Sequence, residues 1–205
     1  MATAEKILIT AEEYLVRERK AEYKSEYFRG ETFAMAGASA RHNLIVSNVI
    51  VSLGSQLRKR PCLVYPCDLK LKIESTGLFT YPDITVVCGE PKFLDDHDDV
   101  LLNPVVIIEV LSESTEAYDR GKKFEHYRSI ASVQQIVLIA QERIAVDCFS
   151  RGANNEWMFR SSSNLDSSLR LDSVQCEVPL SEIYDKVQLD PPEPLPNDPD
   201  KDHKK

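Results

Sequence analysis

The apolar positions of the chain follow two periods in alternating segments. Residues 39–59 repeat apolar side chains at helical spacing, which predicts a long helix with one buried face. That face carries His42, Ile45, Val49 and Leu53. Two short runs, DITVVC at 83–88 and VVIIEVL at 105–111, are rich in β-branched side chains and predict buried strands. The patterns therefore predict a sheet with at least one helix packed on it.

The remaining elements are predicted from capping, turn and alternation patterns. A helix opens at the capping box of Thr10 and Glu13, and a hairpin over 26–36 turns at Arg29-Gly30. Strands follow at 62–66 and 69–73, bent at Pro66, and a second helix covers about 119–130 with Asp119 as its cap. A strand at 133–139 continues into an antiparallel extension through 144–149 and 156–160. This order predicts an α/β (α+β) layer fold, in which helices flank a central mixed β-sheet.

The composition fits a single globular domain. The chain has 205 residues, of which 42% are hydrophobic and 28% charged, and we assign 1–189 to one domain. Residues 190–205 hold five prolines and almost no apolar side chain, which predicts a disordered tail. No apolar run approaches the roughly 20 residues of a membrane span, and glutamates interrupt the N-terminus where a signal peptide needs an apolar core. Five cysteines without paired spacing favour reduced thiols and hence the cytoplasm.

The net charge of -8 argues against a protein that coats nucleic acid through bulk charge. The acidity is concentrated in residues 61–118, where 11 acidic and 3 basic side chains give -8. Part of it is a cluster that predicts a solvated loop: Asp95, Asp96, Asp98 and Asp99. Basic side chains remain to contact phosphates near a site, namely Arg41, Arg58, Lys59, Arg60, Arg120 and Lys122. The charge therefore does not exclude DNA, and it predicts weak, salt-sensitive, metal-dependent binding.

Two carboxylates in or beside apolar runs point to a metal. Glu109 lies inside VVIIEVL, and a carboxylate buried there must be paired, metal-bound or protonated. The alternative is a structural ion pair or a strand end that reaches water. Asp83 alone would be interpreted as a turn residue, but antiparallel pairing of the two strands would place it beside Glu109. Two adjacent carboxylates repel, and Mg²⁺, with Mn²⁺ as a substitute, would relieve this repulsion.

The helix predicted over 119–130 carries two adjacent lysines. On a helical wheel Lys123 lies on the apolar face, whereas Lys122 is turned about 100° towards solvent. A lysine that faces the sheet needs an anionic partner, which Asp83 and Glu109 supply. The alternative is a lysine whose ammonium simply reaches water. Two carboxylates, a metal ion and a lysine are what metal-assisted phosphodiester hydrolysis requires.

These residues belong to a longer series of motifs. It consists of YPDITVV, NPVVIIEVLSESTEAYDRGKKFEHYRSI and VQQIVLI. The series resembles the PD-(D/E)XK nuclease superfamily and, more narrowly, its large bacterial putative restriction endonuclease family. The resemblance runs from about Glu26 to about Tyr184. It implies a restriction-endonuclease-like core, a metal site made by Asp83 and Glu109, and an endonuclease that hydrolyses DNA phosphodiester bonds.

Two departures from the superfamily pattern define further candidates. Leu111 stands where a lysine is expected two residues after the glutamate, and Lys123 from the following helix fits that role. In the superfamily the first core helix often supplies a glutamate, but residues 32–67 contain no Asp or Glu. Glu31 and His42 are the substitutes, although His42 also fits a hydrogen-bonded core histidine.

Three functions remain open on the sequence. The first is a Mg²⁺-dependent DNA endonuclease in which Asp83 and Glu109 bind the metal and Lys123 stabilises charge, with Asp119 either orienting Lys123 or only capping its helix. The second is a catalytically degenerate nuclease fold that serves as a binding module, because the expected lysine is missing. The third is a metal-dependent phosphoesterase that acts on RNA. Cleaving both strands of a duplex takes two active sites, so symmetry favours a homodimer.

Overall fold

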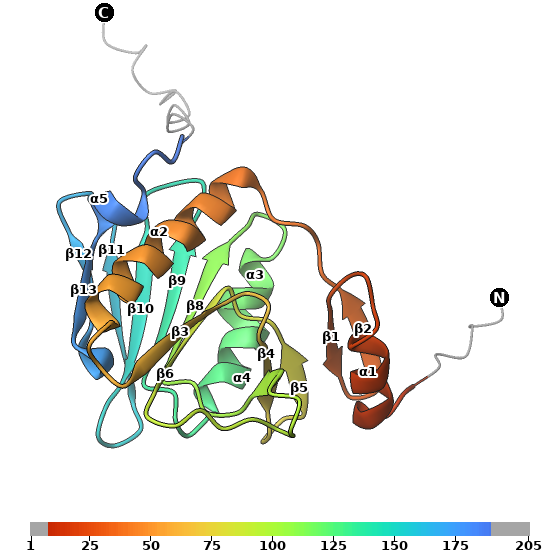
Figure 1. The fold of residues 1–205 in the computed structure, drawn as a ribbon. Helices are drawn as coiled ribbons and strands as arrows, with labels where there is room; N and C mark the ends of the chain where they lie inside the picture. Colours follow the sequence, from red (N-terminus) through yellow and green to blue (C-terminus); the bar gives the residue numbers. More distant parts are fainter. Residues whose placement is uncertain (1–7, 190–205) are drawn as a thin grey trace, which may run out of the picture.

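A six-stranded sheet forms the centre of the computed structural model, which describes residues 8–189 (Figure 1). Its strands follow in the order β11 (Trp157–Ser162), β10 (Val146–Arg151), β9 (Gln135–Ala140), β8 (Val106–Leu111), β6 (Ile84–Cys88) and β3 (Cys62–Pro66). β8 and β9 pair in parallel, and the other neighbours pair antiparallel. The predicted mixed sheet with its antiparallel extension is confirmed. The assignment of 1–189 to one domain stays a prediction, and the predicted tail, 190–205, lies outside the described residues.

One face of this sheet is covered by α2 (Ala40–Leu57), as its apolar face predicts (Figure 1). Ser39 caps the helix by accepting the N–H of His42. Ile45, Val49 and Leu53 are buried against the central strands. Near α2 lie the hairpin of β12 (Ser168–Leu171) and β13 (Cys176–Pro179), a 3₁₀ turn (Asp172–Val174) and α5 (Leu180–Ile183). Neither α2 nor any other helix within residues 8–189 combines the length and apolar character that crossing a bilayer requires.

The opposite face packs against a second sheet and a helical segment. The second sheet has the order β2 (Glu31–Ala34), β1 (Ser25–Phe28), β5 (Leu78–Thr80), β4 (Lys70–Ile73) and β7 (Val100–Leu101). The helical segment joins β8 to β9 and consists of α3 (Glu116–Tyr118), a π-helix (Asp119–Lys123) and α4 (Phe124–Arg128). Apolar side chains of β4, β5 and α4 share a core with those of β6, β8 and β9. The strands predicted at 62–66 and 69–73 thus lie in different sheets.

The helix α1 (Ala11–Glu18) and the hairpin of β1 and β2 form an N-terminal unit beside the rest of the fold (Figure 1). Thr10 and Glu13 make the predicted capping box, and the predicted turn has positive φ angles at Arg29 and Gly30. Arg19 Nη2 donates to Asp95 Oδ2 and to Asp99 Oδ1, each at 2.8 Å. Two acids of the cluster predicted as a solvated loop therefore hold the N-terminal unit in place.

The helix predicted to begin at Asp119 begins earlier, at Glu116. Asp119 therefore does not cap it, because the residues before it are already helical. Asp119 lies in the π-helix, and its buried carboxylate is 3.5 Å from Lys123 Nζ. Attraction to a buried ammonium explains why this carboxylate turns inward where a cap would face the backbone.

Two cysteines are joined, contrary to the prediction of five reduced thiols. The antiparallel register of β3 and β6 places Cys62 opposite Cys88, and they form a disulfide. The other three, Cys67, Cys148 and Cys176, are free. The prediction was wrong because strand pairing, and not spacing along the sequence, brings the two sulfur atoms together.

Candidate active site

The pairing of β6 with β8 brings Asp83 and Glu109 together. Ile84 lies opposite Ile108 in this antiparallel ladder, so the residues one step beyond them also face each other. The Asp83 N–H lies 3.4 Å from Glu109 Oε2, and the Val110 N–H donates to Asp83 Oδ2 at 2.7 Å. Side chains alternate along β8, with Ile108 and Val110 packed in the core under α2. Glu109 therefore points towards the second sheet and the helical segment.

Each carboxylate is held through one oxygen and presents the other. Asp83 Oδ2 accepts a backbone N–H and lies 3.1 Å from His42 Nε2. Glu109 Oε1 accepts the Tyr127 hydroxyl and lies 2.9 Å from Lys123 Nζ, whereas Oε2 has only its long contact with the Asp83 N–H. Among the contacts of residues 8–189, Asp83 Oδ1 and Glu109 Oε2 are thus the oxygens left to coordinate a cation.

Lys123 points into the protein as the helical wheel predicts. Its side chain is 6% exposed, whereas Lys122 is exposed. The π-helix contributes to this orientation: the Phe124 N–H donates to the Asp119 carbonyl, five residues back. Residues four apart drift by about 40° around an α-helix, and the wider turn offsets this drift. Asp119, Lys123 and Tyr127 consequently all lie on the buried side.

Glu26 joins this cluster, and the sequence did not predict it. It lies in β1 of the N-terminal unit, and its Oε1 is 3.6 Å from Lys123 Nζ. The same oxygen accepts the Thr80 hydroxyl, and Oε2 accepts the Tyr118 hydroxyl at 3.2 Å. The available signal was a glutamate placed between buried strand residues. The contact itself depends on how the hairpin docks, which no local pattern encodes.

His42 reaches Asp83 from the first turn of α2. Its Nε2 lies 3.1 Å from Asp83 Oδ2, and its side chain is 13% exposed. Its Nδ1 is buried and has no hydrogen-bond partner among the described residues. The capping Ser39 also donates to Gln141 Oε1 at 2.8 Å, which ties this end of α2 to the end of β9. His42 therefore supports the orientation of Asp83, in agreement with its interpretation as a hydrogen-bonded histidine.

The structure places the other supporting candidates differently. Asp119 lies in the cluster, beside Lys123. Glu31 lies in β2, at the edge of the second sheet, where it pairs in register with Phe28. The carboxylate that reaches Lys123 from the hairpin is that of Glu26. Glu31 was the expected substitute for the glutamate missing from the first core helix, and Glu26 was not among the candidates.

Burial and charge shift the pKa values of the cluster. Burial raises the pKa of Glu109; the Lys123 ammonium opposes this rise and the Asp83 charge adds to it. Burial favours neutral Lys123, but nearby carboxylates, Glu109 first, outweigh it and hold the pKa of Lys123 well above its ordinary value. If all were ionised, the four carboxylates of Glu26, Asp83, Glu109 and Asp119 would exceed the one ammonium by three negative charges. A divalent cation would offset most of this excess.

The donors fit Mg²⁺ or Mn²⁺. Within residues 8–189 no group of three or more His, Cys, Asp and Glu side chains is placed to hold a metal ion. The oxygen donors at the site are the two adjacent carboxylates of Asp83 and Glu109. Mg²⁺ is commonly held by one or two carboxylates, with water and substrate phosphate completing its octahedron. A structural zinc site, by contrast, needs four nitrogen or sulfur ligands. The oxygen pair therefore suits a hard cation.

Most of the basic side chains expected to contact phosphates are already paired or distant. Arg41 pairs with Glu142, and Arg120 bonds Asp147 and Glu116 at 2.6 and 2.7 Å. Arg60 donates to the carbonyls of Val174 and Gln175. Arg58 and Lys59 follow the far end of α2, about 24 Å along its axis from His42.

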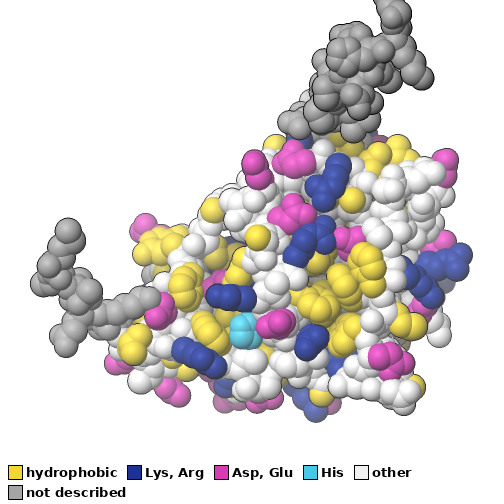
Figure 2. Space-filling view, turned by 180° about the vertical axis from the view of Figure 1, so that it is seen from behind, with side chains coloured by type: hydrophobic (Ala, Val, Ile, Leu, Met, Phe, Trp, Pro, Cys, Tyr) yellow, Lys and Arg dark blue, Asp and Glu magenta, His cyan; other side chains and the backbone are white. Residues whose placement is uncertain are grey.

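The surface gives the same impression of mixed charge, because basic and acidic side chains are interspersed on the face shown in Figure 2. Lys122 stays exposed beside Lys123.

Comparison with known families identifies the family of this chain. The sequence model of the Uma2 family, whose description is "Putative restriction endonuclease", matches residues 11–181. The chain belongs to the Uma2 family. The resemblance inferred from the YPDITVV and VVIIEVL motifs is therefore confirmed.

This Uma2 chain is also similar to individual proteins and to a solved structure. Two uncharacterised Synechocystis proteins are similar over most of their length. One, sll1609, is 36% identical over 77% of this chain and 89% of its own; the other, slr1290, is 31% identical over 86% and 91%. A crystal structure of "a putative nuclease belonging to DUF820" from Anabaena variabilis superposes with a TM-score of 0.70 over 86% of this chain and 97% of that one, at 18% identity. The predicted nuclease-type fold is thereby confirmed.

Proposed function

We propose that this Uma2 chain is a Mg²⁺-dependent endonuclease that hydrolyses DNA phosphodiester bonds. The observation that carries the proposal is the contact of Lys123 with Glu109, 2.9 Å apart and buried, beside Asp83. A strand end, a second strand and a helix contribute one residue each. The family and the related fold support the broader class of nuclease.

The two carboxylates would hold the metal and the lysine would act beside it. Mg²⁺ bound by Asp83 and Glu109 would neutralise charge at the scissile phosphate and lower the pKa of an attacking water. The Lys123 ammonium, fixed among carboxylates in a largely dry site, would stabilise negative charge that develops on the phosphate. Tyr127 and His42 hold one oxygen of each carboxylate, so both are oriented before substrate arrives.

DNA is the proposed substrate and the cytoplasm the proposed compartment. The Cys62–Cys88 disulfide removes the argument from reduced thiols. The proposal of a cytoplasmic protein therefore rests on the proposed substrate alone. A homodimer is the proposed assembly, since two sites related by a two-fold axis would cut both strands of a duplex.

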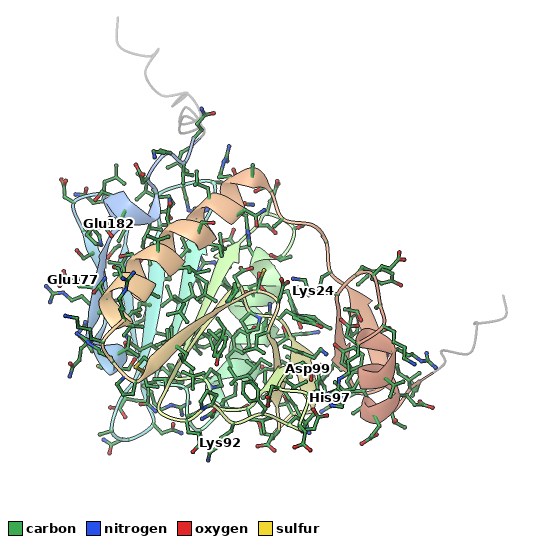
Figure 3. All side chains as sticks on the ribbon, viewed as in Figure 1. Lys24, Lys92, His97, Asp99, Glu177 and Glu182 are labelled. Atoms are coloured by element: carbon green, nitrogen blue, oxygen red, sulfur yellow. A yellow bond between two sulfur atoms is a disulfide. The ribbon has the colours of Figure 1, made fainter. Side chains whose placement is uncertain are left out.

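Cleavage of supercoiled plasmid by the purified full chain tests the proposal. We expect nicking with Mg²⁺ or Mn²⁺, none with EDTA, and rates lower by about 100-fold or more in Asp83→Asn and Glu109→Gln. Glu177→Gln serves as the control, because this exposed carboxylate pairs with Arg170 and not with the site (Figure 3).

Each of the other outcomes has a separate meaning. Metal-dependent cleavage that survives in both site variants would reject Asp83 and Glu109 as ligands. Cleavage of RNA but not of DNA would assign a phosphoesterase with another substrate. A folded wild-type protein that cleaves neither would be a degenerate nuclease fold that serves as a binding module.

A further inference from the structure

One buried carboxylate links the two parts of the candidate site. Glu26 is 8% exposed. Its Oε1 accepts the hydroxyl of Thr80, three residues before Asp83. Its Oε2 accepts the hydroxyl of Tyr118, five residues before Lys123. Glu26 therefore joins the segment that leads into Asp83 to the helical segment that carries Lys123.

The same carboxylate approaches the Lys123 ammonium from the second sheet, whereas Glu109 approaches it from the central sheet. Glu109 approaches Nζ from β8 at 2.9 Å, and Glu26 approaches it from β1 at 3.6 Å. A lysine side chain has a flexible four-carbon stem, and ordering it costs rotamer entropy. Anionic partners that come from two different sheets restrict the ammonium to the space between them. Without Glu26 the ammonium would keep Glu109 on β8 and Asp119, at 3.5 Å, on its own helical segment, but it would lose its only partner on the second sheet among the described residues.

The position of Glu26 is set by how the N-terminal unit docks. Arg19 is paired with Asp95 and Asp99, and the Tyr81 hydroxyl donates to Glu18 Oε1 at 2.8 Å. Lys24 Nζ donates to the Cys67 carbonyl at 3.1 Å. Lys24 and Asp99 are seen at the boundary between this unit and the rest of the fold in Figure 3. These polar contacts fix β1, and with it Glu26, relative to the site.

We propose that Glu26 is a positioning residue that holds the Lys123 ammonium beside the Asp83/Glu109 pair, acting from the N-terminal unit. Its contacts are with Lys123, Thr80 and Tyr118, so it acts through the lysine. The consequence for catalysis rests on the proposed nuclease function, whereas the hold on the ammonium does not.

Hydrogen exchange of the Lys123 ammonium tests the hold without any need for activity. We would record the ¹⁵N NMR signal of lysine ammonium groups in the full chain and assign Lys123 by its loss in Lys123→Arg. Exchange should be at least about tenfold faster in Glu26→Gln than in wild type. Glu18→Gln is the matched control, because it perturbs the same unit through Tyr81 and Ser25 without a contact to Lys123. Equal exchange in Glu26→Gln and wild type, or equal acceleration in both variants, overturns the proposal.

Cleavage kinetics then test the catalytic consequence. Glu26→Gln should lower kcat by about tenfold or more while KM for DNA stays within about twofold, because a misplaced lysine affects the transition state more than binding. An unchanged kcat in Glu26→Gln with an active wild type contradicts the positioning role. An inactive wild type contradicts the nuclease proposal instead, and the exchange result still decides the role of Glu26.

A second variant covers the case in which Glu26→Gln does not fold. Tyr118→Phe removes a donor to Glu26 Oε2 and leaves every charge in place. It should accelerate exchange of the Lys123 ammonium in the same direction, and wild-type exchange in this variant overturns the proposal.

Discussion

Lys123 Nζ lies 2.9 Å from Glu109 Oε1, although one residue belongs to the π-helix and the other to β8. This contact supplies a cation to a carboxylate that the sheet would otherwise bury alone. It also places a fixed positive charge beside the oxygens available to a metal. The adjacent lysine, Lys122, has the same chemistry and faces solvent.

Replacing each lysine with methionine separates these two positions. Lys123→Met should lower the rate of metal-dependent cleavage by about 10²–10³-fold, as loss of one preorganised electrostatic group does. It should also reduce stability, by about 3–5 kcal/mol without metal, because it leaves buried Glu109 unpaired. Lys122→Met should stay within about twofold in rate. Rate measurements and urea unfolding check both, and the opposite order of rates would assign the role to Lys122.

Loss of His42 should weaken metal binding. His42→Ala leaves Asp83 Oδ2 with the Val110 N–H as its remaining donor, so the carboxylate is less well oriented. We expect about 10–100-fold lower affinity for Mn²⁺, the usual effect of removing a group that orients a metal ligand. Isothermal titration calorimetry measures it, with His97→Ala as the control on the exposed acidic loop. Unchanged affinity in His42→Ala would limit this histidine to a packing role.

Metal binding should become tighter as pH rises across the neutral range. Burial raises the pKa of Glu109, so at lower pH this carboxyl holds a proton that competes with the cation. The sign is fixed: binding releases the proton, and the affinity stops rising once Glu109 is ionised in the free protein. Mn²⁺ titrations at several pH values check this. Glu109→Gln should lose this component of the pH dependence while His42→Ala keeps it.

The disulfide should be visible in a count of thiols. Alkylation of the denatured, unreduced protein should modify Cys67, Cys148 and Cys176, and reduction should raise the count to five. Mass spectrometry of the peptides gives the answer. Five modified cysteines before reduction would mean that Cys62 and Cys88 face each other on β3 and β6 as free thiols.

The residues that sequence could predict are those fixed by one local period. Asp83 and Glu109 follow from two neighbouring strands, and Lys123 follows from the phase of one helix. Glu26 could not be predicted, because its role depends on how the hairpin docks. That docking combines the register pair of Tyr27 with Phe79 and the polar contacts of the N-terminal unit, which no local pattern encodes. The prediction of five reduced thiols was wrong for the same reason, because only the register of β3 and β6 in the folded protein brings Cys62 opposite Cys88.

The antiparallel register of β6 and β8 also decides which changes in length the chain can accept. Side chains alternate between the two faces, so one residue inserted or deleted inside either strand would send Asp83 or Glu109 into the apolar layer beneath α2. The long connection between these strands lies outside the ladder, and we expect it to vary in length without separating the pair. In a comparison of homologous chains, gaps should therefore be rare on either side of Ile84 and Ile108. Gaps in the connection should avoid Asp95 and Asp99, which hold Arg19.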